Sequence, residues 1–254
     1  MQHCHRGINP VFNDPYFSPG QGWSESTHVF FRGNLLPERL ASWSSGVFSV
    51  GELGFGTGLN MWTLLSHYQT LTGEKLLPAP SCVHEGNPEK ILKLYSVDAH
   101  PLDIHELSCL LNPYVEDLGG QEVLDLYLGS YSRIMNGKDR VGSDRFFLGS
   151  TEVLIQVWKS DVMELLNDLI FREVTCDAWF LDGHDPAKNP EMWSSELMAM
   201  VARCTVPGGT LATFTAAGTV KQALRNAGFS LVRRKGFGNK RHMIQGTLEA
   251  SIPG

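Results

Sequence analysis

The sequence has no run of apolar residues that approaches the roughly 18 needed for a helix to cross a bilayer. Its first residues, MQHCHRGINP, also lack the apolar core of a secretory signal. The five cysteines are scattered, and no two of them form a Cys-x-x-Cys pair, so the sequence indicates neither a disulfide framework nor a zinc knuckle. We therefore expect a cytoplasmic protein with reduced thiols and no membrane partner.

Metal-ligand clusters are also scarce, apart from His3, Cys4 and His5. These three side chains could in principle bind a soft metal ion. An isolated cluster of three ligands near a chain end is weak evidence for a site, so we expect no bound metal.

Acidic residues are absent from positions 197–248, although the whole chain has a formal net charge of −6. This segment has a charge of +8, so the remainder of the chain has a charge of −14. An anionic partner would select such an asymmetry, but a solvated face that balances an acidic body explains it equally well. The eight basic residues are Arg203, Lys221, Arg225, Arg233, Arg234, Lys235, Lys240 and Arg241.

The chain is long and apolar enough to bury a large core, since it has 254 residues of which 42% are hydrophobic. Its first 46 residues are dense in turn formers and aromatic residues and show no long helical period. We expect an N-terminal cap or hairpin over residues 1–46, packed on one larger domain over residues 47–254.

From Phe48 onward, apolar strand-like segments alternate with segments of helical periodicity. This alternation is typical of a parallel sheet with helices on both faces, and the last two segments predict an antiparallel hairpin at one edge. We predict a doubly wound α/β fold with a mostly parallel sheet of seven strands. The strand-like segments are FSVGELG, LKLYSVDAH, TEVLIQVWKSD, CDAWFLDG, GTLATFTAAG, FSLVRRKG and KRHMIQGTL.

Two stretches interrupt this alternation. Residues 70–90 are punctuated by Pro and Gly, and we expect an inserted excursion there. PLDIHELSCLL predicts a helix with Pro101 near its first turn, where a missing N–H is tolerated. The region that follows this helix is rich in Gly and Ser and shows no clear pattern.

Acidic residues lie at or near the carboxyl ends of the predicted strands, namely Glu52, Asp98, Asp161 and Asp182. Ligands bind beyond these strand ends in open parallel sheets. Glu52 comes just before the loop Gly54-Phe55-Gly56-Thr57-Gly58, whose glycines allow positive φ and a close approach of backbone to ligand. We expect this loop and the acidic residues to form the ligand site.

The loop departs from the dinucleotide fingerprint G-x-G-x-x-G, because Leu59 occupies the position of its third glycine. Asp98 is placed to bind a ribose diol, which both NAD and S-adenosylmethionine contain. The carboxylates around the loop suit a cationic sulfonium and would repel a pyrophosphate. S-adenosylmethionine is therefore the expected cofactor. The alternatives are an ordinary turn with incidental acids and, ranked last, an NAD-dependent dehydrogenase.

Four longer segments resemble one family: NDPYFSPGQGWSESTHVFFRGN, ELGFGTGLN, FLDGHDPAKNPEMW, and ATFTAAGTVKQALRNAGFSLVRRKGFGNKRHMIQGTL. They resemble the methyltransferase domain of the bacterial MnmC-type enzymes. These enzymes methylate the aminomethyl group on carbon 5 of a wobble 2-thiouridine in tRNA. The resemblance implies a Rossmann-like class I methyltransferase domain over residues 47–254, with S-adenosylmethionine as the methyl donor.

The resemblance also implies roles for single residues. Asp98 would bind the ribose, although the family more often has Glu there, and Asp161 would approach the adenine amino group, although the family usually has Gly before it. Asp182 would lie at the methyl-transfer centre, where it orients and deprotonates the amine. The implied cofactor residues are Glu52, Gly54, Gly56, Gly58, Asn60, Asp98, Asp161 and Asp182.

The chain departs from the family at the lip of the implied active site. It reads Asp182-Gly183-His184-Asp185-Pro186 where the family usually has Asp-Gly-Phe-Ala-Pro. Two polar side chains there could change the substrate, and His184 could assist proton removal because an imidazole titrates near neutral pH. The alternative is a solvent-exposed substitution without a catalytic role.

The resemblance gives the basic C-terminal residues a use. A tRNA anticodon stem-loop would meet the predicted hairpin through its phosphates, and Phe237 could stack on an unpaired base or pack the turn. The implied RNA-binding residues are Arg233, Arg234, Lys235, Lys240 and Arg241. We expect no DNA partner.

No second G-x-G-x-x-G motif follows the implied methyltransferase domain. Bifunctional members of the family carry an FAD-dependent oxidase as well, so we expect a stand-alone methyltransferase that relies on a separate oxidoreductase. Two further alternatives stay open, a class I methyltransferase of a small molecule or protein, and a non-catalytic RNA-binding or interaction module with the same fold.

Overall fold

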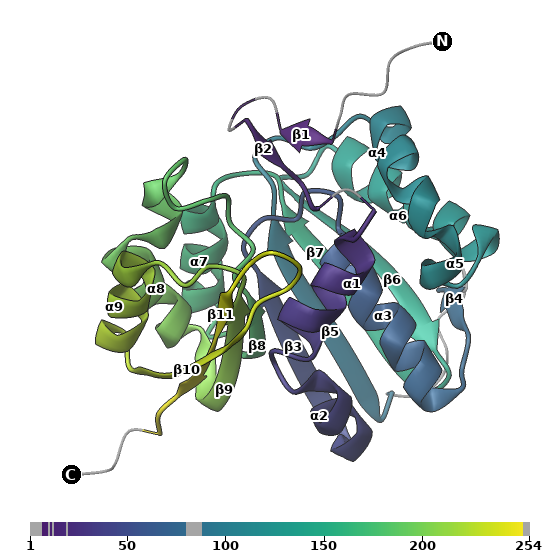
Figure 1. Ribbon diagram of the computed structural model, residues 1–254. Helices are drawn as coiled ribbons and strands as arrows, with labels where there is room; N and C mark the ends of the chain where they lie inside the picture. The colour runs from purple at the N-terminus through teal and green to yellow at the C-terminus, as the bar shows by residue number, and fades with distance from the viewer. Residues whose placement is uncertain (1–6, 10, 12, 19, 80–87, 251–254) are drawn as a thin grey trace.

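The computed structural model describes residues 7–250 apart from 10, 12, 19 and 80–87. Within these residues, nine strands form one sheet that runs through the molecule (Figure 1). A separate two-stranded hairpin, β1 (Ile8–Asn9) and β2 (Asp14–Pro15), precedes it. The strands of the large sheet are β3 (Gly46–Glu52), β4 (Leu76–Pro78), β5 (Lys90–Val97), β6 (Val141–Leu148), β7 (Thr151–Trp158), β8 (Cys176–Phe180), β9 (Thr205–Thr213), β10 (Phe229–Lys235) and β11 (His242–Leu248).

Helices cover both faces of this sheet (Figure 1). One face is covered by the elements from the first part of the chain: α1 (Gly22–Ser26), the π-helical turn η1 (Thr27–Phe31), α2 (Leu36–Ser42), α3 (Leu59–Thr72), α4 (Ile104–Leu111), the 3-10 turn η2 (Asn112–Tyr114), α5 (Val115–Leu118) and α6 (Gln121–Asn136). The other face has α7 (Val162–Phe171), the 3-10 turn η3 (Pro190–Trp193), α8 (Ser195–Arg203) and α9 (Gly218–Asn226).

The strand order is β10-β11-β9-β8-β3-β5-β7-β6-β4. The five strands from β9 to β7 are parallel, and β11 is antiparallel to both of its neighbours. The seven strands from β10 to β7 are therefore the predicted sheet, with the C-terminal hairpin at one edge. The prediction of seven strands is incomplete, because β6 and β4 extend the opposite edge.

Burial on both faces explains the apolar sequences of the central strands. In β5, Leu92 and Leu94 pack into the core beneath α3, whereas Tyr95 and Val97 belong to the core beneath α7 and α8. A strand covered on both faces shows a nearly continuous apolar run in place of alternation.

The region after α4, which shows no clear pattern in the sequence, contains the 16-residue helix α6 and the strand β6. Glycine and serine within α6 obscure its period, but Leu124, Tyr127, Tyr131 and Ile134 are buried on one face. The helix predicted over PLDIHELSCLL is α4, which begins at Ile104, inside that segment. Asp103 caps that helix by accepting from two backbone N–H groups, so Pro101 precedes the first turn.

Order in the sheet reverses at β3, since its parallel neighbour β5 lies on one side of it and its later parallel neighbour β8 lies on the other. Such a point leaves a crevice beyond the carboxyl ends of the strands. The fold therefore places the ends of β3, β5 and β8 around one opening.

The N-terminal segment packs on the sheet through buried polar contacts. Asn34 has no exposed surface, and its amide donates to the carbonyls of Phe30 and Trp179. Its Oδ1 accepts from Thr210 Oγ1, and Arg39 donates to that same hydroxyl. The division of the chain at residue 46 stays a prediction, but these contacts join the segment to β8 and β9.

No helix in the described residues is long and apolar enough to span a membrane. Cys176 and Cys204 are free and buried, as expected. Cys109 is disulfide-bonded, so the expectation of reduced thiols is wrong at this position. Spacing along the chain does not determine which thiols the fold brings together.

We predict that Asn34→Ala destabilises the protein by about 2 to 4 kcal/mol, because it removes three hydrogen bonds and leaves buried partners unsatisfied. Urea unfolding monitored by circular dichroism measures this change. The matched control is Asn136→Ala, since Asn136 is exposed at the end of α6. Equal stability of the two variants would show that Asn34 does not anchor the segment.

Candidate functional site

A cavity of about 920 Å³ opens beyond the carboxyl ends of the central strands. Its walls come from three parts of the chain: the strand ends with their loops, the N-terminal segment, and the turn between β10 and β11. Its size lies at the upper end of the range for small-molecule sites. Sequence-predicted residues that line it are Gly54, Gly56, Asn60, Asp98, Asp161, Asp182 and Lys240.

The glycine loop between β3 and α3 forms the floor of the cavity. Gly54 has a φ of 105°, and a side chain there would come within 2.7 Å of the carbonyl oxygen of Asp182. Gly56 has a φ of 52° and lies against the ring of Tyr16. Only glycine combines such angles with such close approach, which explains the G-x-G pattern.

A single amide joins two carboxyl groups from adjacent strand ends. Asn60 Nδ2, in the first turn of α3, donates to Glu52 Oε1 at 3.0 Å and to Asp182 Oδ2 at 2.6 Å. Ser96 Oγ donates to the other oxygen of Glu52 at 2.8 Å. Glu52 is fully buried and does not line the cavity, and its hydrogen bond from Asn60 links it to a residue that does.

Burial makes these acids weak. It raises the pKa of Glu52 to about 8 and the pKa of Asp182 to about 7, and the proximity of other carboxylates adds to both shifts. Burial also raises the pKa of Asp98 to about 6. A bound cation would favour the charged forms of all three groups, so the cavity suits a positively charged ligand.

Asp98 and Asp161 lie at the ends of β5 and β7. Asp98 follows β5, and its carboxylate accepts from the backbone N–H of His100 at 2.8 Å. Asp161 caps α7 by accepting from the backbone N–H of Glu164 at 3.0 Å. Both residues line the cavity, but part of the accepting capacity of Asp161 is used by the helix.

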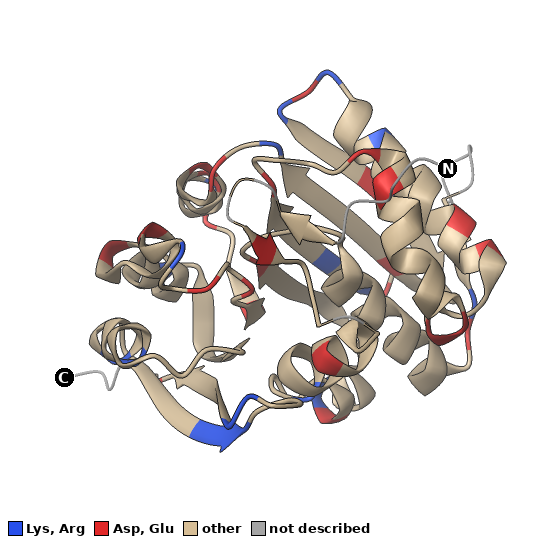
Figure 2. Ribbon diagram, turned by 45° about the horizontal axis from the view of Figure 1, so that its top comes forward, with Lys and Arg blue, Asp and Glu red and all other residues tan. Residues whose placement is uncertain are grey.

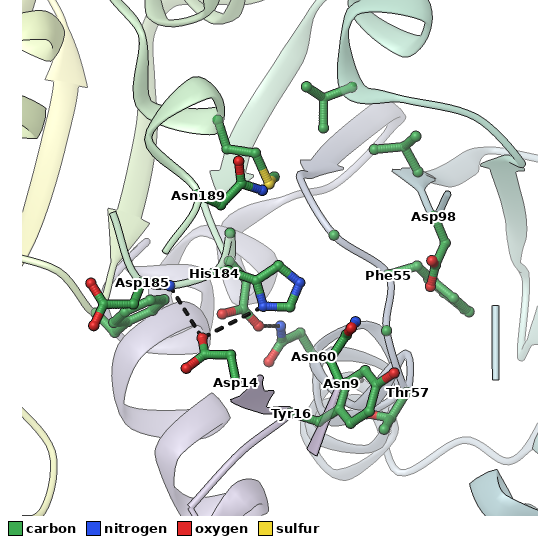
Figure 3. A pocket seen from close by; sticks show the side chains of 18 of the residues that line it. Asn9, Asp14, Tyr16, Phe55, Thr57, Asn60, Asp98, His184, Asp185 and Asn189 are labelled. Atoms are coloured by element: carbon green, nitrogen blue, oxygen red, sulfur yellow. Dashed lines mark hydrogen bonds and ion pairs between the residues drawn. The ribbon is translucent and has the colours of Figure 1, made fainter. Parts of the chain in front are cut away.

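The lip of the cavity is a polar cluster centred on Asp14 from the N-terminal hairpin (Figure 3). Asp14 Oδ2 lies 3.5 Å from His184 Nδ1 and accepts from the backbone N–H of Asp185, while its Oδ1 pairs with Lys188 at 2.6 Å. Burial lowers the pKa of His184, so the imidazole is neutral at pH 7. His184 and Asp14 are half-buried in the cavity wall, whereas the Asp185 side chain is exposed, so the two departures from the family pattern differ in placement.

Lys240 reaches the cavity from the turn between β10 and β11. Its Nζ lies 2.8 Å from Glu25 Oε1 and 4.3 Å from the centre of the Phe214 ring. Burial would raise the pKa of Glu25, but the hydrogen bond and charge of Lys240 outweigh it, and the pKa is lowered. Glu25 is therefore a buried carboxylate that is held ionised by a lysine.

The other predicted RNA-binding residues lie outside the cavity. Figure 2 shows basic residues of β10 and of the turn after it along one edge of the sheet. Arg233, Arg234, Lys235 and Arg241 are all exposed, and Arg234 donates to Gln245 at 3.2 Å. The structure thus groups these four residues and separates Lys240 from them.

Reasoning from the sequence missed the contribution of the N-terminal segment. Asp14, Tyr16 and Glu25 all line the cavity. The available signal was the presence of acidic residues within an aromatic, turn-rich stretch, which a purely structural cap does not require.

The described residues contain no group of three or more side chains that could hold a metal ion. The cluster His3, Cys4 and His5 lies outside the described residues.

Part of the chain matches a known protein family. Residues 127–249 match the model of a family described as S-adenosyl-L-methionine-dependent methyltransferase. The matched region includes Asp161, Asp182 and the basic hairpin, whereas the glycine loop precedes it.

A solved structure, MNMC2, shares the fold. MNMC2 from Aquifex aeolicus matches with a TM-score of 0.67 and 19% identity, over 97% of this chain and 67% of that chain. A putative class I S-adenosylmethionine-dependent methyltransferase from Listeria monocytogenes matches with a TM-score of 0.47 and 12% identity, over 98% of this chain and 64% of that chain. TrmN from Thermus thermophilus matches with a TM-score of 0.42 and 13% identity, over 91% of this chain and 53% of that chain.

The α/β fold with its reversal point at β3 and its antiparallel edge hairpin is the one that the resemblance implied, and S-adenosylmethionine is the cofactor of the matched family. This protein thus shares its fold with MNMC2, and residues 127–249, slightly under half of the chain, are similar to that family of S-adenosyl-L-methionine-dependent methyltransferases.

Proposed function

We propose that the protein transfers a methyl group from S-adenosylmethionine to the aminomethyl group of wobble 5-aminomethyl-2-thiouridine in tRNA. The observation that supports this most directly is Asp182. Its weakly acidic carboxyl lines the cavity together with the glycine loop, and exposed basic residues lie on β10 and on the turn after it. The similarity to MNMC2 and the resemblance to the MnmC-type family favour a tRNA acceptor over a small molecule.

The residues of the cavity fit the proposed donor. Gly54 and Gly56 allow close contact of backbone with a ligand, and Asp98 has a carboxylate oxygen at the end of β5 for a ribose diol. Asp161 would receive the adenine amino group, and Asn60 would transmit the charge of Glu52. Gly58 does not line the cavity but allows close packing beneath the loop, because a side chain there would collide with Tyr127 Oη. When bound, the donor supplies an electrophilic methyl group.

Asp182 would prepare the acceptor. A primary alkylamine is mostly protonated at neutral pH, and only its free lone pair can form the new carbon–nitrogen bond. A carboxylate with a pKa of about 7 can accept that proton and can orient the nitrogen. Asn60 holds the carboxylate in place through a hydrogen bond of 2.6 Å.

The basic edge would position the tRNA. Arg233 and Lys235 alternate with Arg234 along β10, and Arg241 precedes β11. Exposed guanidinium and ammonium groups bind phosphates without reading sequence. Methyl transfer does not create the aminomethyl group, so we propose that a separate oxidoreductase supplies it.

The reaction is tested with labelled S-adenosylmethionine and tRNA from cells that lack the final methylation, followed by nucleoside analysis. We expect label in 5-methylaminomethyl-2-thiouridine. Asp182→Asn should reduce turnover by about 100-fold or more, because the base is lost. Donor binding, measured by calorimetry, should persist. Asp125→Asn, at an exposed site on α6, is the control. Labelled protein or small molecules without labelled tRNA would exclude this function.

The pH dependence should follow Asp182. Because burial raises its pKa to about 7, the carboxyl is protonated below this pH and cannot accept a proton. We expect kcat/KM to rise through a midpoint near pH 7. Asn60→Ala removes a hydrogen bond that lowers this pKa, so the midpoint should move to higher pH. The pKa of the free amine is the same for both proteins. An unshifted midpoint would therefore show that the rise in kcat/KM reports ionisation of the substrate amine and not of Asp182.

The RNA surface is tested by charge reversal. We predict that Arg233→Glu with Lys235→Glu raises KM for tRNA about tenfold or more and flattens the dependence of log KM on log salt concentration. Turnover at saturating tRNA should change little. Lys138→Glu is the control, because Lys138 is exposed in the turn after α6. An unchanged salt dependence would place the RNA elsewhere.

A further inference from the structure

The contact between Lys240 and Glu25 joins residues 215 positions apart inside the cavity. The ammonium of Lys240 has two partners there, the carboxylate of Glu25 at 2.8 Å and the face of the Phe214 ring at 4.3 Å. Both partners line the cavity. A primary alkylammonium therefore already occupies a defined position in the cavity wall.

This position has the chemistry of an ammonium site. A carboxylate supplies the opposite charge, and an aromatic face attracts a cation through its quadrupole. Glu25 is only 8% exposed, and its second oxygen accepts from the backbone N–H of Ser18 at 3.3 Å. The carboxylate is thus fixed in direction, and a buried carboxylate without a cation would be costly.

The site is also close to the proposed base. Glu25, Lys240 and Asp182 all line the same cavity. An acceptor nitrogen held by Glu25 would therefore share that cavity with the carboxylate that takes its proton. The aminomethyl group of the proposed acceptor is a primary ammonium, as is the end of the Lys240 side chain.

We propose that Glu25 and Phe214 form the subsite for the primary ammonium of the methyl acceptor, and that Lys240 occupies this subsite until the acceptor displaces it. The proposal rests on the proposed function and deepens it, because it assigns the residues that recognise the acceptor amine. Lys240 then acts as an internal competitor of the substrate.

Displacement of Lys240 has a physical route. Its side chain is 44% exposed, so the ammonium can move toward solvent. Arg241 and the basic residues of β10 lie on the outside of the same hairpin, where the proposed function places tRNA phosphates. A phosphate there would offer Lys240 a replacement for Glu25.

The test compares two nucleosides that differ in charge, 5-aminomethyluridine and 5-hydroxymethyluridine, by calorimetry on the protein saturated with S-adenosylhomocysteine. Lys240→Met removes the ammonium but keeps an unbranched side chain over Phe214. We expect it to bind the aminomethyl nucleoside at least about fivefold more tightly than wild type. Binding of the hydroxymethyl nucleoside should not change.

Glu25→Gln completes the cycle. When it is added to Lys240→Met, Glu25→Gln should abolish the gain in affinity for 5-aminomethyluridine. The amide keeps the shape of the carboxylate but not its charge. Thermal melting of each variant confirms folding. Equal effects on both nucleosides, or a gain that survives Glu25→Gln, would overturn the proposal.

Two further outcomes separate this proposal from other roles. A tenfold loss of S-adenosylmethionine affinity in Lys240→Met would assign Lys240 to the carboxylate of the donor and would overturn the proposal. If tRNA is not methylated but benzylamine, a generic primary amine, shows the same dependence on Lys240 and Glu25, the subsite stands and the tRNA function fails. If tRNA is methylated without any dependence on Glu25, the function stands and the subsite fails.

Discussion

The hydrogen bonds from the Asn60 amide to Glu52 and Asp182 are the interaction on which the rest of the site depends. Two carboxyl groups at the ends of adjacent parallel strands would repel each other if both were ionised and unshielded. The amide reduces that repulsion and holds both groups in one geometry. A cation in the cavity would relieve the remaining unfavourable charge, so the site favours a positively charged ligand before any specific contact is considered.

Charge is divided across the molecule in a way that matches this demand. The basic segment 197–248 contains β10, which lies at the edge of the sheet. The acidic residues Asp14, Glu25, Asp98 and Asp182 line the cavity. Lys240 is the basic residue of that segment that lines the cavity. A polyanion would therefore be attracted to the edge and repelled from the interior, while a cationic donor experiences the opposite.

Much of the fold could be predicted from the sequence, because buried parallel strands show long apolar runs and turn residues separate them. The glycine loop and the acidic strand ends were also recognisable, since Gly54 and Gly56 have backbone angles that other residues rarely adopt. The extension of the sheet by β6 and β4 could not be recognised in the sequence. The helical period of α6, which precedes β6, is interrupted by glycine and serine, and β4 has only three residues.

The site was harder to predict wherever it depends on long-range contacts. Lys240 was indistinguishable in sequence from the exposed basic residues around it, and only the fold shows that it faces Glu25. Glu52 was expected to contact the ligand, but it is fully buried and works through Asn60. His184 was noted as a departure from the family, and its partner Asp14 lies 170 positions earlier in the chain, beyond any local pattern.

Distant pairing of this kind has a consequence for how the protein matures. Glu25 and Lys240 come from opposite ends of the described chain, so neither wall of the proposed amine subsite exists alone on a growing polypeptide. The two walls meet only when the hairpin of β10 and β11 has docked on β9. Recognition of the acceptor amine by the proposed subsite would therefore depend on this long-range docking step in folding.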